Sequence, residues 1–143
     1  MEKKPRDILS YNNISITNPR LLVIEELLST KKPIAIEDLQ IKLKDKVAVS
    51  TLYRVISDLK SINILEEITS PDNITMVELS LVDTPHHHHM FCEYCGDVVD
   101  VELSEEFENK LDNEIRALEN KLQIKINDHG LELLGSCKAC LKD

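Results

Sequence analysis

Apolar residues in the first half of the chain recur at helical spacing. In the clearest stretch, residues 50–61, the buried stripe of a helix at i, i+3, i+4 and i+7 is formed by Leu52, Val55, Ile56 and Leu59. Similar patterns predict helices over residues 5–11, 17–29 and 36–44. Thr17 followed by Pro19 is typical of a helix N-terminus, because Thr caps free amide groups and Pro suits the first turn.

The pattern then changes to short strands. Residues 64–69 and 74–79 flank Ser70-Pro71-Asp72-Asn73, four residues that favour turns, so a hairpin is predicted. Three helices followed by a two-stranded wing form a winged helix-turn-helix, whose last helix enters the major groove of DNA. Because many winged helices bind protein instead, the topology alone leaves both kinds of partner open.

A second, smaller unit is predicted beyond a hinge at residues 81–85. Strands are expected over residues 90–92, 97–102, 122–126 and 131–134. A helix from Ser104 to about residue 120 would carry an apolar stripe of Phe107, Leu111, Ile115, Leu118 and Leu122. We therefore expect an α+β protein with a winged helix over residues 1–80, a hinge over 81–85 and a small α/β domain over 86–143. A domain this small needs a metal or a second copy for stability.

Charge is distributed unevenly along the 143 residues. The net charge of −9 argues against nucleic-acid binding, but residues 1–60 hold eleven Lys and Arg against eight Asp and Glu, whereas residues 61–143 hold six against eighteen. This division favours a front that contacts a polyanion and a back that holds cations, although an acidic protein with a chance imbalance explains it equally well. No apolar run reaches the ~20 residues of a membrane span and no signal-peptide pattern is present, so we expect a cytoplasmic protein.

All four cysteines fall into two Cys-x-x-Cys pairs, Cys92/Cys95 and Cys137/Cys140. Two such pairs supply four thiolates, the complete tetrahedral shell of a structural Zn²⁺. Disulfides are the weaker interpretation in a chain without a secretion signal. A rubredoxin-like iron centre uses the same ligands, so the spacing leaves zinc and iron open.

Four consecutive histidines, residues 86–89, run directly into the first cysteine pair. Alternate side chains of a strand point to opposite faces, so His86 and His88 would face one way and His87 and His89 the other, towards two separate metal sites. Mixed His and carboxylate ligands suit Zn²⁺, Fe²⁺ or Mn²⁺. Candidate partners are Glu78, Asp100, Glu105, Glu106, Glu108 and His129. The alternative is a solvated polyhistidine loop with adventitious metal affinity.

Four segments together resemble the ferric-uptake-regulator (Fur) family of bacterial metalloregulators. In order, they are Thr17-Asn18-Pro19-Arg20, Ser50-Thr51-Leu52-Tyr53-Arg54-Val55, the histidine run leading into Cys92-Glu93-Tyr94-Cys95-Gly96, and His129-Gly130-Leu131 through Gly135-Ser136-Cys137-Lys138-Ala139-Cys140. The resemblance covers essentially the whole chain. It implies a winged helix, a dimerisation domain, and a homodimer that binds AT-rich inverted repeats of double-stranded DNA when loaded with metal.

The resemblance also implies roles for individual residues. The four cysteines would hold structural zinc, and a regulatory Zn²⁺, Fe²⁺ or Mn²⁺ would bind Glu78, His87, His89 and Asp100. An additional site would use His86, His88, His129 and a helix glutamate, Glu108. DNA would be contacted by Arg20, Ser50, Thr51, Tyr53 and Arg54, with Tyr53 suited to a thymine methyl and Arg54 to a phosphate or a guanine edge.

The chain departs from the family pattern at several positions. Pro33 stands where many iron-, manganese- and peroxide-sensing members have a sensing-site histidine, which favours zinc; zinc sensors, however, commonly use an extra cysteine, and all four here belong to the pairs. The segment between Glu78 and His86 is about two residues longer than in the family pattern. Phe107 takes the place of the expected helix glutamate, so Glu106 or Glu108 would substitute.

Function is therefore predicted to be metal-responsive transcriptional regulation, most simply repression of metal-homeostasis genes. A peroxide-sensing regulator is an alternative within the family, and a redox or metal-handling protein with a four-cysteine centre is the alternative outside it. A metal-dependent hydrolase is the less favoured third class, because the chain has no Gly-rich phosphate loop, nucleophile elbow or His-Glu-x-x-His helix. We expect the protein not to be an enzyme.

Overall fold

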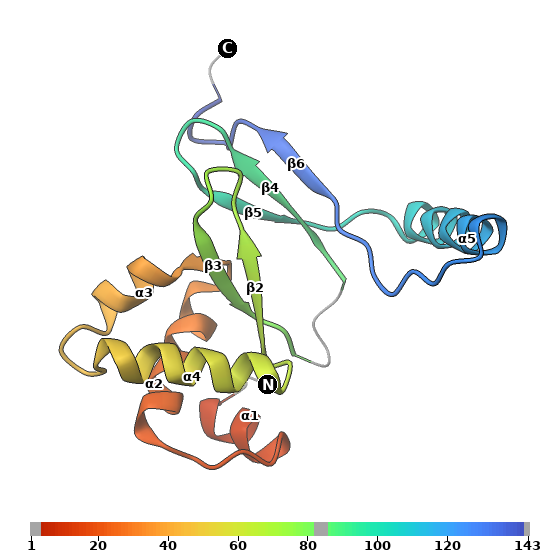
Figure 1. Ribbon diagram of the computed structural model, residues 1–143. Helices are drawn as coiled ribbons and strands as arrows, with labels where there is room; N and C mark the ends of the chain where they lie inside the picture. Colours follow the sequence, from red (N-terminus) through yellow and green to blue (C-terminus); the bar gives the residue numbers. More distant parts are fainter. Residues whose placement is uncertain (1–3, 82–85, 142–143) are drawn as a thin grey trace. The chain divides into compact units, whose positions relative to one another are not determined.

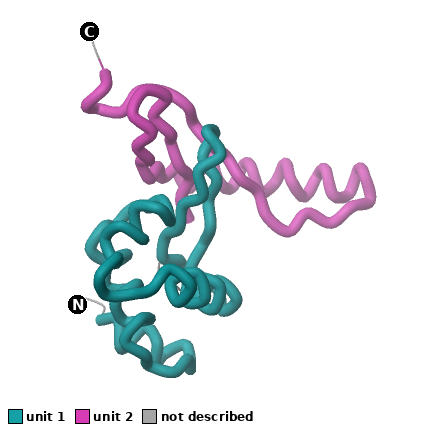
Figure 2. Tube along the Cα trace, turned by 60° about the vertical axis from the view of Figure 1, so that its left-hand side comes forward, with its two compact units in different colours: residues 1–84 teal, residues 85–143 magenta. Residues whose placement is uncertain are grey.

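A computed structural model of the chain describes residues 4–81 and 86–141. The chain forms two compact units, Met1–Thr84 and Pro85–Asp143, coloured separately in Figure 2. Of the predicted hinge over residues 81–85, only Leu81 belongs to the described residues. Within the described ranges, no helix combines the length and the apolarity that crossing a membrane requires.

Unit 1 is a helical bundle with a hairpin (Figure 1). Its helices are α1 (Pro5–Tyr11), α2 (Asn18–Thr30), α3 (Ile36–Lys42) and α4 (Val49–Ser61). Its antiparallel sheet has the order β1-β3-β2 and consists of β1 (Ile34–Ala35), β2 (Leu65–Thr69) and β3 (Thr75–Leu79). The four helices and the hairpin predicted for this half of the chain are confirmed to within two residues. The short β1 was not predicted, because two residues are too few to show a period.

The core of unit 1 forms around the apolar stripe of α4. All four members of the stripe are buried and belong to a cluster with α1, α2 and α3: Leu9, Val23, Ile24, Leu27, Leu39, Leu52, Val55, Ile56 and Leu59. Burying this face orients the opposite face of α4 outwards, where Tyr53 is 50% exposed. The amphipathic pattern of one helix thus decides which side chains unit 1 presents to a partner.

Unit 2 contains a three-stranded sheet and one long helix. The strands are β4 (His88–Cys92), β5 (Val98–Val101) and β6 (Glu132–Gly135), in the order β5-β4-β6 with β4 and β6 parallel. The helix α5 (Glu105–Leu122) stands apart from the sheet in Figure 1. The predicted N-cap is confirmed, because Ser104 Oγ accepts the Phe107 N–H at 3.2 Å.

The predicted strand over residues 122–126 is wrong. Helix α5 continues through Leu122 and ends at Gln123, whose φ of 56° is left-handed. The amide of Ile126 donates to the Glu119 carboxylate at 3.0 Å instead of to a neighbouring strand. Alternating apolar residues at 122, 124 and 126 resemble a strand, but strand preference depends on packing against neighbouring strands, and here the segment ends α5 instead.

Candidate metal centres and nucleic-acid interface

Strand pairing brings the two cysteine pairs together. Cys92 ends β4 and lies opposite Gly135 in the parallel β6, so Cys137 follows two residues beyond that register pair. Each pair then turns tightly, with the Gly96 N–H donating to the Cys92 carbonyl and the Cys140 N–H to the Cys137 carbonyl, both at 3.0 Å. Gly96 has a φ of +76°, a conformation that favours glycine, which explains why it follows the first pair.

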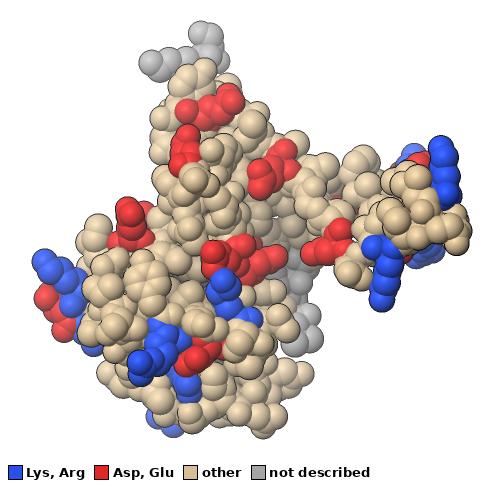
Figure 3. Space-filling view, viewed as in Figure 1, with Lys and Arg blue, Asp and Glu red and all other residues tan. Residues whose placement is uncertain are grey.

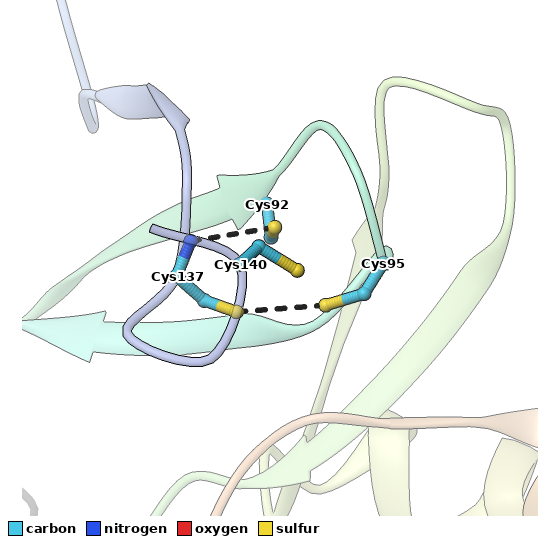
Figure 4. A group of neighbouring side chains, drawn as sticks. All are labelled: Cys92, Cys95, Cys137 and Cys140. Carbon is cyan, nitrogen blue, oxygen red and sulfur yellow. Dashed lines mark hydrogen bonds between the residues drawn. The ribbon is translucent and has the colours of Figure 1, made fainter. Parts of the chain in front are cut away.

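The four sulfur atoms converge on one point (Figure 4). They lie within 4.8 Å of one another, and Cys95 Sγ is 3.6 Å from Cys137 Sγ. A tetrahedral zinc site with bonds of ~2.3 Å separates its sulfur atoms by about 3.8 Å, whereas a disulfide joins them at about 2.05 Å. All four are free thiols. Their arrangement fits one tetrahedral cation.

The electrostatics of the four thiols favour a bound cation. The backbone amides of Cys137 and Cys95 lower the pKa of Cys92 to about 6, with the Cys137 N–H 3.3 Å from the Cys92 sulfur (Figure 4). Contacts with the Cys137, Cys95 and Cys92 side chains raise the pKa of Cys140 to about 12. The cluster therefore favours negative charge on one sulfur but opposes four thiolates together. A divalent cation removes that opposition.

The first histidine cluster gathers residues from three parts of unit 2. His88 Nε2 lies 2.7 Å from Glu108 Oε1, while His86 Nε2 and His129 Nε2 lie 3.6 Å and 3.5 Å from Glu108 Oε2. His88 is almost fully buried at 3% exposure. One carboxylate in the first turn of α5 thus faces three imidazole rings. These four residues are the ones predicted from the sequence for the additional site.

This cluster also has the chemistry of a cation site. The hydrogen bond with His88, followed by the charges of His86 and the other rings, lowers the pKa of Glu108, so its carboxylate is anionic at neutral pH. Among the described residues, the buried Nε2 of His129 has no hydrogen-bond partner. A buried ring nitrogen beside an anionic carboxylate is suited to a divalent metal.

A cavity of about 330 Å³ adjoins this cluster and is lined partly by His86, Glu108, Asp112 and His129. Asp112 was not among the site residues predicted from the sequence. It lies four residues after Glu108, a spacing that places two helical side chains on one face. This spacing from Glu108 was the sequence feature from which Asp112 could have been predicted to line the site.

The second pair of histidines faces the other way, as the alternation predicts. His87 Nε2 and His89 Nε2 approach the same Asp100 oxygen at 3.8 Å and 3.5 Å. Asp100 lies opposite His89 in the antiparallel pairing of β4 with β5. Glu78, the remaining residue predicted for the regulatory site, belongs to β3 of unit 1 and is a buried carboxylate at 5% exposure.

The predicted nucleic-acid interface lies on α4. Ser50, Thr51, Tyr53 and Arg54 occupy its first two turns, on the side away from the buried stripe. In Figure 3, Lys and Arg atoms lie over the helical part of unit 1. The hairpin differs, because residues 65–79 contain no Lys or Arg, and Lys60 of α4 forms an ion pair with Glu67 of β2.

Arg20 is not presented in the same way as the α4 residues. Its guanidinium donates to the Ser15 carbonyl at 2.8 Å and to Ser15 Oγ at 2.6 Å, and it lies 3.3 Å from an Asp58 oxygen. The Arg20 side chain is 17% exposed. Asp58 could not be predicted from the sequence, because a single acidic residue on a polar helix face carries no distinctive pattern.

A winged helix in one unit, with a four-cysteine cluster and two histidine–carboxylate clusters in the other, defines the class of metal-binding winged-helix proteins. The model of the ferric uptake regulator family matches residues 11–134. The chain therefore belongs to the ferric uptake regulator family, whose members among the relatives are transcriptional regulators.

Two relatives show how the chain stands within the family. The ferric uptake regulation protein of Bacillus subtilis (strain 168) is 26% identical over 137 residues, covering 92% of this chain and 89% of the relative. The peroxide-responsive repressor PerR of Staphylococcus aureus (strain Mu50 / ATCC 700699) is 30% identical over 136 residues, covering 92% and 86%.

Solved structures share the fold. The Helicobacter pylori ferric uptake regulator Fur, described with three functional metal-binding sites, superposes with a TM-score of 0.72 at 20% identity, covering 96% of this chain and 89% of that one. A zinc uptake regulator in complex with zinc and DNA gives a TM-score of 0.65 at 23% identity, covering 94% and 89%. At these identities the likeness establishes the α+β fold, with its winged helix and second domain.

Proposed function

We propose that this protein is a metal-responsive, DNA-binding transcriptional repressor that acts as a homodimer. The proposal rests on how β4 and the two residues before it distribute candidate metal ligands. Alternate histidines of this segment face two different carboxylates, Glu108 and Asp100, and Cys92 at its end is one of four cysteines whose sulfur atoms converge. Its relatives are regulators, which supports this function over an enzymatic one.

Structural zinc is proposed at Cys92, Cys95, Cys137 and Cys140. The four sulfur atoms already stand at separations suited to a tetrahedral ion, so zinc would tie the end of β4 to the segment after β6. Unit 2 has a small core, and a metal crosslink would supply stability that its apolar contacts lack.

Regulatory metal is proposed at His87, His89 and Asp100, completed by Glu78. In the sequence, Glu78 and His87 lie on opposite sides of the predicted hinge, so an ion held by both would link the two units. Metal would then favour the arrangement of units that fits the operator. By linkage, metal and DNA would strengthen each other's binding, by ~1–3 kcal/mol in typical systems.

A further metal site is proposed at His86, His88, Glu108 and His129. Support comes from the anionic Glu108 carboxylate and the buried Nε2 atom of His129. A cation there would crosslink β4, the first turn of α5 and the loop before β6. This site would stabilise unit 2 without joining it to unit 1.

Double-stranded DNA is the proposed partner of α4, with an AT-rich inverted repeat as its operator. Tyr53 offers an apolar ring to a thymine methyl, and Arg54 offers a guanidinium to a phosphate or a guanine edge. Ser50 and Thr51 would contact phosphates at the helix N-terminus. The hairpin carries carboxylates and no cations, so we assign DNA contact to α4 and not to the wing.

A second copy of the chain is the proposed partner of unit 2. The apolar stripe of α5 has no buried member, and β6 exposes apolar side chains as well; those more than two-fifths exposed are Phe107, Leu118, Leu122 and Leu134. Exposed apolar patches of this kind mark interaction surfaces. An inverted-repeat operator requires two equivalent reading helices, which a symmetric homodimer supplies.

The regulatory ion is proposed to be Zn²⁺, Fe²⁺ or Mn²⁺. Pro33 stands at the position where many iron-, manganese- and peroxide-sensing members have a sensing-site histidine, and the lack of that histidine favours zinc. The similarity to a peroxide-responsive repressor supports a second candidate function, peroxide sensing through oxidation of a metal-bound His87 or His89.

Fluorescence anisotropy with an AT-rich inverted repeat tests the proposal. Protein with its tightly bound metal quantified is titrated with Zn²⁺, Mn²⁺ or anaerobic Fe²⁺, and binding that appears with one ion identifies the signal. Loss of binding after stoichiometric peroxide, restored by neither reductant nor fresh metal, would assign the peroxide-sensing function. DNA binding that does not change with any of the three metals would overturn the proposal in favour of a metal-handling protein.

A further inference from the structure

Arg20 joins three segments of unit 1. One terminal nitrogen donates to both the carbonyl and the hydroxyl of Ser15, in the segment before α2, and the other reaches Asp58 on α4. Two bonds to Ser15 orient the planar guanidinium, so its second nitrogen is directed at the Asp58 carboxylate without further ordering. With 17% of its side chain exposed, Arg20 presents little of its charge to solvent.

Asp58 is an unusual residue for its position. It lies on the helix that carries the DNA-reading residues, four residues after Arg54, and side chains at this spacing are neighbours on one helix face. Its side chain is 42% exposed. A carboxylate there would repel a phosphate backbone and would also attract the guanidinium of Arg54, withdrawing that group from DNA.

Arg54 is available in the structure. Its side chain is exposed, and among the described residues Arg54 takes no part in the ion pairs that join Arg20, Lys42 and Lys60 to carboxylates. The carboxylate nearest to it along the helix face is engaged by Arg20 from the other helix. The two arginines therefore have different surroundings, because Arg20 meets a protein carboxylate and Arg54 meets solvent.

We propose that Arg20 is a positioning residue that neutralises Asp58 and so keeps Arg54 free for DNA, and that Arg20 does not itself contact DNA. This inference rests on the proposed function and changes the role that the sequence assigned to Arg20. It makes α2 a support for the reading helix through one ion pair, in addition to their shared apolar core.

A double-mutant cycle on operator binding tests the inference. Arg20→Ala should weaken binding about tenfold, since an unpaired carboxylate is left beside the DNA. Asp58→Asn should bind within about twofold of the wild type, and Arg20→Ala/Asp58→Asn should recover most of the lost affinity, because the offending charge is gone. Lys110→Ala removes one cation from an exposed ion pair of unit 2 and reports the effect of net charge alone.

The salt dependence separates the two possible roles of Arg20. The slope of log K against log salt in the double variant should equal that of the wild type. A direct phosphate contact by Arg20 would instead reduce that slope by about 0.9 and leave the double variant as weak as Arg20→Ala, which would overturn the inference. Circular dichroism and thermal unfolding verify that each variant is folded. Absence of metal-dependent binding by the wild type would overturn the proposed function itself, a different result.

Discussion

His88 and Glu108 meet at hydrogen-bond distance, with 2.7 Å between Nε2 of the ring and Oε1 of the carboxylate. The contact joins the start of β4 to the first turn of α5, across 20 residues of sequence. It selects Glu108 among the glutamates of that turn, because Glu106 is exposed and lies near Lys110 instead. Glu108, the residue after Phe107, is therefore the glutamate of this turn that faces the histidine cluster.

Replacing Glu108 should weaken metal binding at the histidine cluster. Glu108→Gln removes the anionic charge that faces three imidazoles while keeping the shape of the side chain. In protein whose four-cysteine site is already filled, we expect the affinity of this cluster for Zn²⁺ to fall roughly 10- to 100-fold, as measured by competition with a chromophoric chelator. Glu106→Gln is the matched control and should bind like the wild type. Equal losses in the two variants would mean that the acidic turn acts only through its overall charge.

The same contact predicts a pH dependence of stability. The pKa of Glu108 is lowered, chiefly by the hydrogen bond with His88, so its folded pKa lies below its unfolded value. The stabilisation is therefore complete above the ordinary carboxyl pKa of about 4.3 and is lost as pH falls through the folded pKa. In metal-free protein, the Tm difference between the wild type and Glu108→Gln should be present at about pH 6 and vanish under acidic conditions. A difference that grows on acidification would contradict this assignment.

Removing one buried thiol should abolish the structural zinc. Cys137 is buried at 6% exposure, and Cys137→Ser leaves three thiolates and an incomplete shell. We expect co-purifying zinc to be lost and the unfolding of unit 2 to become non-cooperative or to shift well below that of the wild type, because binding energy at such a site is folding energy. Calorimetry with metal analysis measures both. A strong chelator should lower the Tm of the wild type more than that of Cys137→Ser, in which the structural zinc is already lost.

His87 and His89 should be required for the effect of metal on DNA binding. In His87→Ala/His89→Ala, the metal-induced gain in operator affinity should disappear, a loss of roughly 5- to 150-fold at saturating metal. Affinity without added metal should stay at its wild-type value, since neither residue belongs to α4, the helix proposed to contact DNA. His129→Ala supplies the comparison, because it removes a ligand of the other cluster. A metal response that persists in the double variant would place the sensor elsewhere.

The residues of α4 proposed to contact DNA, Tyr53 and Arg54, should contribute to DNA binding without contributing to the stability of the fold. Tyr53 is half exposed, so Tyr53→Ala should leave thermal stability nearly unchanged while weakening operator binding by about 1–3 kcal/mol, as should Arg54→Ala. Tyr11→Ala, which removes an even more exposed tyrosine from α1, is the matched control for anisotropy. Specificity should relax at the base pair that Tyr53 reads, whereas a uniform loss on all sequences would indicate backbone contact only.

Local patterns in the sequence were sufficient for most of the secondary structure and for the candidate ligands. The stripe of Leu52 and Leu59 determined which face of α4 is buried, because a helix period fixes a face wherever it occurs. Alternation along a strand separated His86 and His88 from His87 and His89, because side chains of a strand must point to opposite sides. Both inferences use only near neighbours in the chain.

Contacts between segments far apart in the sequence were decided only by the tertiary structure. Only the parallel pairing of β4 with β6 brings Cys92 beside Cys137, and only the contact between α2 and α4 turns Arg20 towards Asp58. Residues 122–126 alternate like a strand and form none, because they end α5 and pair with neither edge strand of the sheet, β5 or β6. Periodicity is a property of a few consecutive residues, whereas a pairing partner, a buried carboxylate or an engaged guanidinium depends on which segments meet when the chain folds.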